Sequence, residues 1–225
     1  NPDTWQDFHY TCTGTYTNGD YVVNCHDGVA HGELDIYGIL GMSCNGAFDT
    51  IAQTLNSTKW QKLAEDFGYN QSDRSQVDFP YKKSHFDIAS DDSVWSRMQL
   101  AIGQGTTTVT PLLNLMIYAA IANDGVMMTP YLVDHYLDAD GNVVEQTKPK
   151  ALRSVCTKAE AELMDEFLTY VITNGTAAAG GSQYARVSGK TGSAQYDSTK
   201  NYHAWFCGYG TNDVSEIAVC VMIEK

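Results

Sequence analysis

The run Gly189-Lys190-Thr191-Gly192-Ser193 combines one cation, two hydroxyl groups and two glycines in five residues. A lysine ammonium group attracts a carboxylate, and the hydroxyls of threonine and serine can donate hydrogen bonds to it. Glycine weakens a strand and often marks a place where a ligand or another backbone comes close. The run therefore predicts a binding site for an extended ligand that carries a carboxylate. Two plainer interpretations stay open: Lys190 protects the edge of a sheet, and Gly192 marks a bulge.

A second candidate group is Ser43-Cys44-Asn45, which opens a stretch with apolar residues at helical spacing. The spacing predicts an amphipathic helix over residues 44–55. Ser43 would lie at the start of this helix, where a hydroxyl can cap free N–H groups. Capping alone would explain the serine, so this group becomes a site only together with other motifs.

The cysteines allow two interpretations. The six lie at Cys12, Cys25, Cys44, Cys156, Cys207 and Cys220, and none forms a Cys-x-x-Cys pair. This spacing weighs against a structural zinc site, although His26 and His31 lie close to Cys25. A Cys12–Cys25 disulfide around the loop 17–20 would stabilise the fold by about 3 kcal/mol in an oxidising compartment. The alternative is six unpaired thiols, most of them buried. We expect no metal site and no cofactor.

Several segments must position these groups. Further helices are expected near residues 63–67 and over 110–125 and 157–175; the last two begin with a threonine cap. A polar loop is expected over 72–93 and a hairpin over about 131–147.

The C-terminal part predicts three strands, at about 185–195, 203–210 and 216–224. The last two form an antiparallel hairpin around the turn 211–213. Helices precede this terminal meander, which predicts an α+β fold with the helices segregated from an antiparallel sheet.

Composition bounds the function. The chain has 225 residues and a formal net charge of −13. This charge would repel a nucleic-acid backbone, so we exclude nucleic acid as a partner. No run of about 18 apolar residues occurs that could span a membrane. The chain begins at Asn1-Pro2-Asp3 without a starting Met, and we interpret it as a piece of a longer protein whose targeting signal lies upstream.

Six short motifs occur together in a fixed order. They are Ser43-Cys44-Asn45, Ile102-Gly103-Gln104-Gly105, Thr110-Pro111-Leu112, Ala122-Asn123-Asp124-Gly125, Lys190-Thr191-Gly192-Ser193-Ala194 and Trp205-Phe206-Cys207-Gly208-Tyr209. In this order they resemble the class B D,D-transpeptidases among the penicillin-binding proteins, within the superfamily of serine β-lactamases and transpeptidases. The Cys12-x-Gly14 and His31-Gly32 stretches are also similar to that family.

The resemblance implies a β-lactamase/transpeptidase-like α+β fold and a partial transpeptidase domain over residues 1–225. Its helical part would cover about 33–130 and 157–175. Its sheet part, about 185–225, would hold the C-terminal three strands of the antiparallel sheet.

The resemblance also implies roles for single residues. Ser43, Asn45 and Lys190 would be catalytic: Ser43 relays a proton, Asn45 holds the acyl amide of the substrate, and Lys190 attracts its terminal carboxylate. Thr191, Gly192 and Ser193 would bind substrate, and the backbone N–H of Ser193 would be one of two oxyanion-hole donors. Cys44 would point away from the cleft into the core.

The nucleophile of that family is the serine of a Ser-x-x-Lys motif, and the chain contains no such motif. The nearest pattern, Ser154 to Lys158, is one residue too long, and Ser198-Thr199-Lys200 has the wrong spacing. We expect the serine upstream of Asn1, and this chain alone to be inactive.

The resulting hypothesis is an enzyme that cross-links peptidoglycan by acyl transfer from stem peptides ending in D-Ala-D-Ala and that β-lactams acylate. A D,D-carboxypeptidase and, more weakly, a β-lactamase stay open. The alternative from another class is a non-catalytic module that senses or binds stem peptides or β-lactams. The resemblance implies work at the extracytoplasmic face of the bacterial cell membrane, an anchor N-terminal to this chain, a link to cell shape, and cell-wall synthesis proteins as partners.

Overall fold

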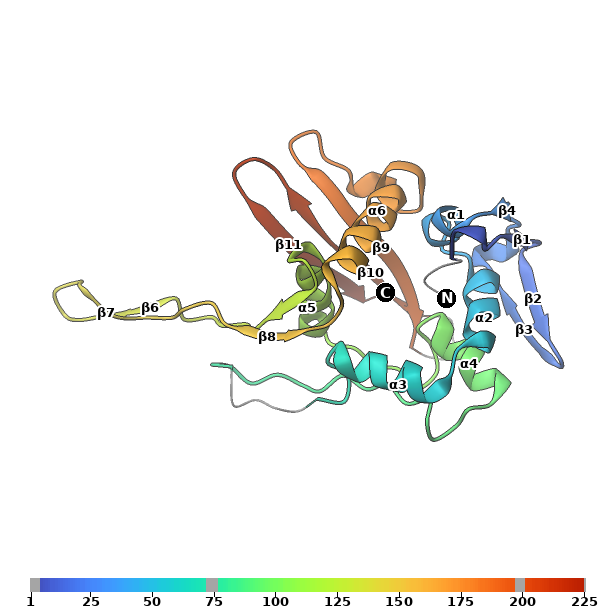
Figure 1. Cartoon of the computed structure of the whole chain (residues 1–225), viewed down its shortest axis with the longest axis horizontal. Coiled ribbons are helices and arrows are strands. Elements are labelled where there is room, and N and C mark those ends of the chain that lie inside the picture. The colour runs from blue at the N-terminus through green and yellow to red at the C-terminus, as the bar shows by residue number, and fades with distance from the viewer. Residues whose placement is uncertain (1–4, 72–76, 197–200, 225) are drawn as a thin grey trace.

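The computed structural model describes residues 5–71, 77–196 and 201–224, and the statements below concern those ranges. Helices gather around a three-stranded antiparallel sheet, and a long hairpin projects from one side of the molecule (Figure 1). Residues 72–76 of the expected polar loop and Ser198-Thr199-Lys200 lie outside the described ranges.

The N-terminal region is built from short strands and 3-10 turns. They are a turn at Trp5–Asp7, β1 (Tyr10–Cys12), β2 (Thr15–Asn18), β3 (Tyr21–Asn24), a turn at His26–Gly28 and β4 (Gly32–Leu34). β1 pairs with β4, and β2 pairs with β3, both antiparallel. Gly19, at φ 60°, allows the tight turn between β2 and β3, since positive φ suits glycine in two-residue hairpins.

Four helices follow, each with an identifiable start. They are α1 (Ile36–Gly41), α2 (Asn45–Thr54), α3 (Ser57–Asp66) and α4 (Val94–Ala101). The side chains of Asp35, Asn56 and Ser93 accept backbone N–H groups at the starts of α1, α3 and α4. Neither α1 nor α4 was expected from the sequence. Both are at most eight residues long, which is too short for a helical repeat of apolar residues to stand out.

The two expected capped helices are confirmed as α5 (Pro111–Ala122) and α6 (Lys158–Asn174). Thr110 caps α5 by accepting the N–H of Leu113, and proline occupies its first position. Thr157 and Glu160 form a reciprocal capping box at the start of α6.

Two small ribbons lie between these helices. β5 (Val126–Met128) pairs with β8 (Ala151–Ser154), and β6 (His135–Leu137) pairs with β7 (Val143–Gln146). The β6–β7 ribbon is the expected hairpin, which projects from the molecule in Figure 1. The β5–β8 pair was not expected, because strands of three or four residues give little periodicity.

The C-terminal sheet consists of β9 (Arg186–Gln195), β10 (Tyr202–Thr211) and β11 (Glu216–Glu224), in the order β11-β10-β9. The register runs without a shift from Tyr202 opposite Gln195 to Thr211 opposite Arg186. The three expected strands and the α+β architecture are therefore confirmed.

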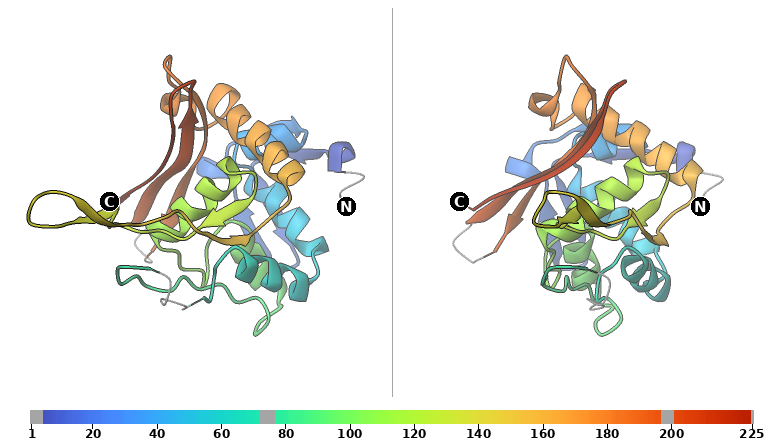
Figure 2. Two further views of the ribbon diagram at one scale, coloured as in Figure 1. Left: turned by 60° about the vertical axis from the view of Figure 1, so that its left-hand side comes forward. Right: turned by 90° about the vertical axis from the view of Figure 1, so that its left-hand side faces the viewer.

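Both long helices cover one face of this sheet. α5 packs against β10 and β11, while α6 packs against β9 and carries α1 on its other side (Figure 2). A short 3-10 turn at Ala178–Gly180 leads from α6 toward β9. On β11 the alternating residues Ile217, Val219, Val221 and Ile223 are 41–61% exposed, so this strand carries an apolar stripe that no described residue covers.

Candidate active site

The lysine motif lies on β9, an edge strand. Lys190, Thr191 and Gly192 lie opposite Cys207, Phe206 and Trp205 of β10. Among the described strands none pairs with the other edge of β9. An edge strand offers unpaired backbone N–H and C=O groups to another extended chain.

Lys190 is half-buried, and its Nζ donates a hydrogen bond to the backbone oxygen of Thr191 at 2.9 Å. Burial lowers the pKa of Lys190 from 10.5 to about 8, because a low-dielectric surrounding disfavours the charged form. No carboxylate of the described residues forms an ion pair with it. Lys190 therefore remains mostly protonated at neutral pH and lacks an internal counter-ion.

Ser43 lies in the turn between α1 and α2 at φ 52°, in the left-handed region. Non-glycine residues adopt this region rarely and at an energetic cost, and such residues cluster at functional sites. The expectation that Ser43 caps the following helix is wrong. Cys44 occupies the cap position of α2, because the left-handed turn at Ser43 places the serine one residue before it.

Asn45 is the first residue of α2, and its side-chain Nδ2 donates to the backbone oxygen of Asn24 at 2.8 Å. This bond uses one of the two N–H donors of the amide and fixes its orientation. The carbonyl that orients Asn45 belongs to the residue directly before Cys25.

Thr176 lies between β9 and the end of α1, close to the Ser43 turn. The backbone N–H of Thr176 donates to the oxygen of Gly41 at 3.0 Å, and its Oγ1 lies 3.0 Å from Oγ1 of Thr191. A Cβ on Gly175 would lie 2.4 Å from the Gly41 oxygen, so only glycine permits this approach. Within the described ranges no hydrogen bond or ion pair links Ser43 or Asn45 directly to Lys190. Thr176, which sequence reasoning did not single out, thus links Thr191 to Gly41, two residues before Ser43.

The whole chain matches one protein family. Residues 3–225 match the model of the penicillin binding protein transpeptidase domain. The chain belongs to this family. The expected β-lactamase/transpeptidase-like fold and the resemblance to class B enzymes are confirmed.

Several curated relatives and solved structures resemble this transpeptidase domain. The peptidoglycan D,D-transpeptidase PbpA of Mycolicibacterium smegmatis is 27% identical over 81% of this chain and 37% of its own length. The peptidoglycan D,D-transpeptidase MrdA of Acinetobacter baumannii is 26% identical over 87% of this chain and 32% of its own length. The D,D-transpeptidase domain of a peptidoglycan glycosyltransferase from Eggerthella lenta superposes with a TM-score of 0.87 at 28% identity, covering 97% of this chain and 55% of that one. The chain therefore spans about a third of the length of these curated relatives.

Asp165 of α6 fixes the start of β9 in the transpeptidase domain. Its Oδ1 accepts the hydroxyls of Ser188 at 2.7 Å and Tyr209 at 2.6 Å, and its Oδ2 pairs with Arg186 at 2.5 Å. Burial opposes its ionisation, but these donors outweigh burial and hold the pKa of Asp165 below its ordinary value. The helical period of α6 gave no signal for this role, because the three partners come from the distant sheet.

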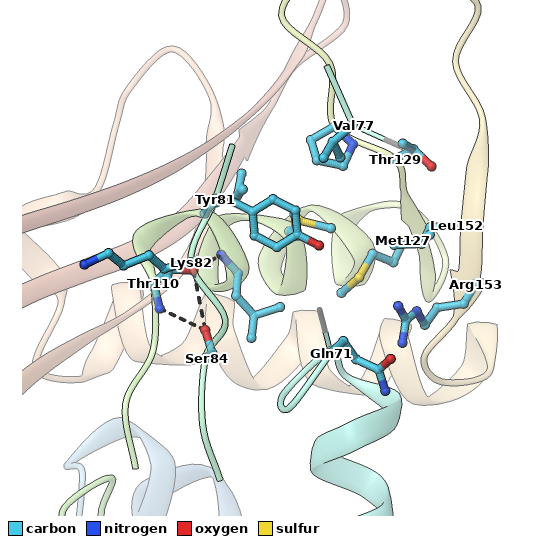
Figure 3. A pocket seen from close by; sticks show the side chains of 15 residues that line it. Gln71, Val77, Tyr81, Lys82, Ser84, Thr110, Met127, Thr129, Leu152 and Arg153 are labelled. Carbon is cyan, nitrogen blue, oxygen red and sulfur yellow. Dashed lines mark hydrogen bonds between the residues drawn. The ribbon is translucent and has the colours of Figure 1, made fainter. Parts of the chain in front are cut away.

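An enclosed cavity of the transpeptidase domain lies elsewhere. It has a volume of about 270 Å³ and is lined by residues of α5, β5, β8 and the segment around Ser84, whose hydroxyl accepts the N–H of Thr110 at 3.0 Å (Figure 3). Neither the Ser43 group nor the Lys190 group lines it. The candidate site is therefore an open strand edge rather than an enclosed pocket.

Three cysteines and one histidine come together beside Ser43. The ligand atoms of Cys12, Cys25, His31 and Cys44 all lie within 4.8 Å of one another. All six cysteines are free thiols, and Sγ of Cys12 lies 3.6 Å from Sγ of Cys25. Cys44 is fully buried, as expected. The sequence spacing that weighed against zinc is a poor guide here, because the residues converge from four separate segments of the chain.

Proposed function

We propose that this chain is the substrate-binding part of a D,D-transpeptidase that cross-links peptidoglycan by acyl transfer and that β-lactams acylate. One observation carries the proposal. The open edge of β9 carries Lys190, which has no carboxylate partner among the described residues, and Thr176 links Thr191 of this strand to Gly41, two residues before Ser43.

The open edge of β9 supports binding of an extended peptide as an added strand. Lys190 would attract the terminal carboxylate of the peptide, and the hydroxyls of Thr191 and Ser193 would donate hydrogen bonds to it. A Cβ at Gly192 would find only Trp205 nearby, at 3.6 Å, so the space over this residue is open to a ligand backbone. The backbone N–H of Ser193 would serve as an oxyanion donor.

The Ser43-Cys44-Asn45 motif would act on the peptide bond that is cleaved. In the proposed reaction a serine Oγ attacks the carbonyl of the penultimate D-Ala, the peptide C–N bond breaks, and Ser43 relays the serine proton to the departing D-Ala amine. An amine of a second stem then attacks the acyl-enzyme and releases the serine. Asn45, already oriented by Asn24, would hold the acyl amide.

The serine nucleophile would come from a part of the protein outside residues 1–225. The chain has no Ser-x-x-Lys motif and spans about a third of its curated relatives. The uncovered apolar stripe of β11 also supports further protein packing on this sheet.

The protein would act at the outer face of the bacterial cell membrane, held by an anchor outside this chain and working with other cell-wall synthesis proteins. Among the described residues no helix has the length and apolar character needed to cross a bilayer. A solved relative, penicillin-binding protein A of Mycobacterium tuberculosis, forms a penicillin G acyl-enzyme complex, with 21% identity and a TM-score of 0.85. At this sequence identity, the likeness to penicillin-binding protein A shows only that the two chains share a fold.

The test is covalent labelling of the full-length protein with a fluorescent penicillin. We expect a labelled band in a denaturing gel, and a labelling rate about 10- to 1000-fold lower for Lys190→Ala, the range seen when a transition-state contact is lost. Lys59→Ala is the matched control, because Lys59 is an exposed helix lysine far from the motif in sequence. If the folded full-length protein takes no label, the proposal that it is an enzyme is overturned, and the alternative of a non-catalytic binding module is favoured. Equal labelling of the Lys190→Ala variant and wild type would remove the role of Lys190.

A further inference from the structure

The Cys12, Cys25, His31 and Cys44 side chains, which we call the cysteine cluster, have the spacing of metal ligands. Sγ of Cys25 lies 3.6 Å from Sγ of Cys12 and 3.8 Å from Sγ of Cys44. Nδ1 of His31 lies 3.4 Å from Sγ of Cys12. These distances are too long for a disulfide and are those of atoms that could share one ion.

Tetrahedral zinc sets the distances between its own ligands. With Zn–S bonds of about 2.3 Å and Zn–N bonds of about 2.0–2.1 Å, two sulfurs are about 3.8 Å apart and a sulfur and a nitrogen about 3.5 Å apart. Three of the six separations between the ligand atoms, 3.6, 3.8 and 3.4 Å, match these values closely, and all six lie within 4.8 Å. Three cysteines and one histidine are also a common ligand set of closed structural zinc sites.

The surroundings of the cluster suit ligating sulfurs. The three cysteines are buried at 0–3% exposure, and His31 is half-buried. The backbone N–H of Gly14 donates to Sγ of Cys12 at 3.4 Å. Cys44 is the cap residue of α2, so its side chain lies at the start of that helix.

Glycine backbone brings two of the ligands together. Gly14, at φ 90°, accepts the N–H of Cys25 at 2.9 Å through its own oxygen. A Cβ on Gly14 would lie 2.2 Å from the oxygen of Gly28, so a side chain there would push apart the two loops that carry Cys12 and Cys25. The site is thus built by the backbone as well as by the side chains.

A disulfide explains this arrangement less well. A Cys12–Cys25 bridge would leave the thiol of Cys44 and the ring of His31 buried against it with no role. Cys25 lies at similar distances from Cys12 and from Cys44, which favours one shared centre over one exclusive pair.

We propose that Cys12, Cys25, Cys44 and Nδ1 of His31 bind one structural Zn²⁺ ion, and that this ion fixes the Ser43-Cys44-Asn45 turn. Four protein ligands leave no open position, so the ion is structural rather than catalytic. It holds Cys44 between the two site residues directly. It also holds Cys25, next to the Asn24 carbonyl that orients Asn45. Zinc is favoured over harder cations because thiolate and imidazole ligands select it.

The first test measures metal in the full-length protein, purified under reducing conditions with zinc and then freed of loosely bound metal by gel filtration. We expect about one zinc equivalent per chain from a closed four-ligand site. Replacement of the zinc by Co²⁺ should give the intense visible bands of a tetrahedral site and a thiolate-to-cobalt charge-transfer band. Neither readout depends on acyl transfer. The zinc proposal can therefore fail while the proposed function stands, and the proposed function can fail while the zinc proposal stands.

Variants assign the metal to the cysteine cluster. Cys25→Ser and His31→Gln should each lower the bound zinc at least about tenfold at limiting free zinc, in keeping with loss of one of four ligands. Cys220→Ser is the matched control and should keep the full equivalent, because Cys220 lies on β11 away from the cluster. Circular dichroism of each variant shows whether it is folded, and the Co²⁺ spectrum of wild type needs no variant at all.

Three results would overturn the proposal. One is a folded, reduced wild-type protein that holds less than about 0.1 equivalent of zinc after exposure to it. Another is a Co²⁺ spectrum without the thiolate charge-transfer band. The third is a folded Cys25→Ser variant that binds as much zinc as Cys220→Ser.

Discussion

Two regions build the candidate site, and they are held together in different ways. The sheet of β9, β10 and β11 is held by backbone hydrogen bonds in an unbroken register across β9 and β10. The corner formed by residues 10–45 has strands of only three or four residues. The corner depends on a few side chains that are far apart in sequence.

The hydrophobic core of the corner also depends on a few side chains. Its buried apolar residues are mostly small, and three of them are the cysteines of the cluster. Small residues bury little apolar surface, and each CH₂ group contributes only about 0.8 kcal/mol. A bound metal ion would supply the stability that this core lacks.

The largest expected effect breaks the corner and spares the sheet. Cys25→Ser, or removal of zinc by a chelator, should destabilise residues 10–45 by several kcal/mol, since structural zinc contributes roughly 10–16 kcal/mol in small zinc-dependent peptides. Hydrogen exchange of the full-length protein should show faster exchange for the amides of β1 to β4. The amides of β9 and β10 should exchange at the wild-type rate. Equal acceleration in both regions would mean that the corner is not a separate unit.

The same difference explains what the sequence could predict. Strands β9 to β11 and the caps of α5 and α6 follow from local patterns, because turn residues, capping residues and apolar periodicity lie within a few positions of one another. The motifs also placed Lys190 on a strand, as observed, and Ser43 at the start of a helix, which in the structure begins two residues later at Asn45.

The remaining features depend on contacts between distant segments. The left-handed backbone of Ser43, the Thr176 link and the cysteine cluster have no local signal. A search for paired cysteines a few residues apart misses ligands at positions 12, 25, 31 and 44, which lie in four separate segments of the chain. The hint in the sequence was His31 close to Cys25, which the spacing of the cysteines outweighed, and the structure adds that Gly14 lets two of the ligand loops pack.

The next effect tests the sheet. Asp165→Ala removes the acceptor shared by Ser188, Tyr209 and Arg186 and leaves two buried hydroxyls without it. We expect a loss of about 2–4 kcal/mol in the free energy of unfolding, the range for disrupting a buried charged network. Chemical denaturation measures it. Glu162→Ala, an exposed change on the same helix, should stay within about 0.5 kcal/mol. A loss as large in this control would assign the effect to α6 itself.

A buried acid on α2, the helix that follows the corner, gives a pH-dependent effect. Asp49 of α2 is fully buried, neither of its oxygens has a partner among the described residues, and burial raises its pKa from 3.8 to about 7. The folded state therefore binds more protons than the unfolded state between about pH 4 and 7, so this group costs stability as pH rises through 7. Asp49→Asn should be more stable than wild type by about 1–3 kcal/mol at pH 8 and equal to it near pH 4, measured by thermal unfolding. A less stable variant at pH 8 would reveal a partner for the carboxylate.

In the sheet, the titratable group with a shifted pKa to compare with Asp49 is Lys190. Its pKa of about 8 makes ligand binding, rather than stability, depend on pH. The protonated lysine attracts the carboxylate of a penicillin, which stays ionised throughout the neutral and alkaline range. The labelling rate of the full-length protein should therefore fall by about three- to tenfold between pH 7 and pH 9. Lys190→Arg separates this titration from others, because arginine remains charged over that range. Its labelling should lose this part of the pH dependence, and an identical profile would place the titration on another group.

The smallest effect on stability separates two glycines of the sheet. A Cβ at Gly208 would lie 2.4 Å from the Ser188 oxygen, whereas a Cβ at Gly192 would meet only Trp205 at 3.6 Å, an ordinary contact. Gly208→Ala should destabilise the protein by about 1–3 kcal/mol, because backbone must move. Gly192→Ala should change stability by less than about 0.5 kcal/mol, yet lower the penicillin labelling rate about tenfold or more by displacing the ligand backbone. Denaturation and labelling of the same two variants give both quantities. If Gly192→Ala left labelling unchanged, a ligand would not lie over this strand, and the conformational freedom of Gly192 would be the only reason for a glycine there.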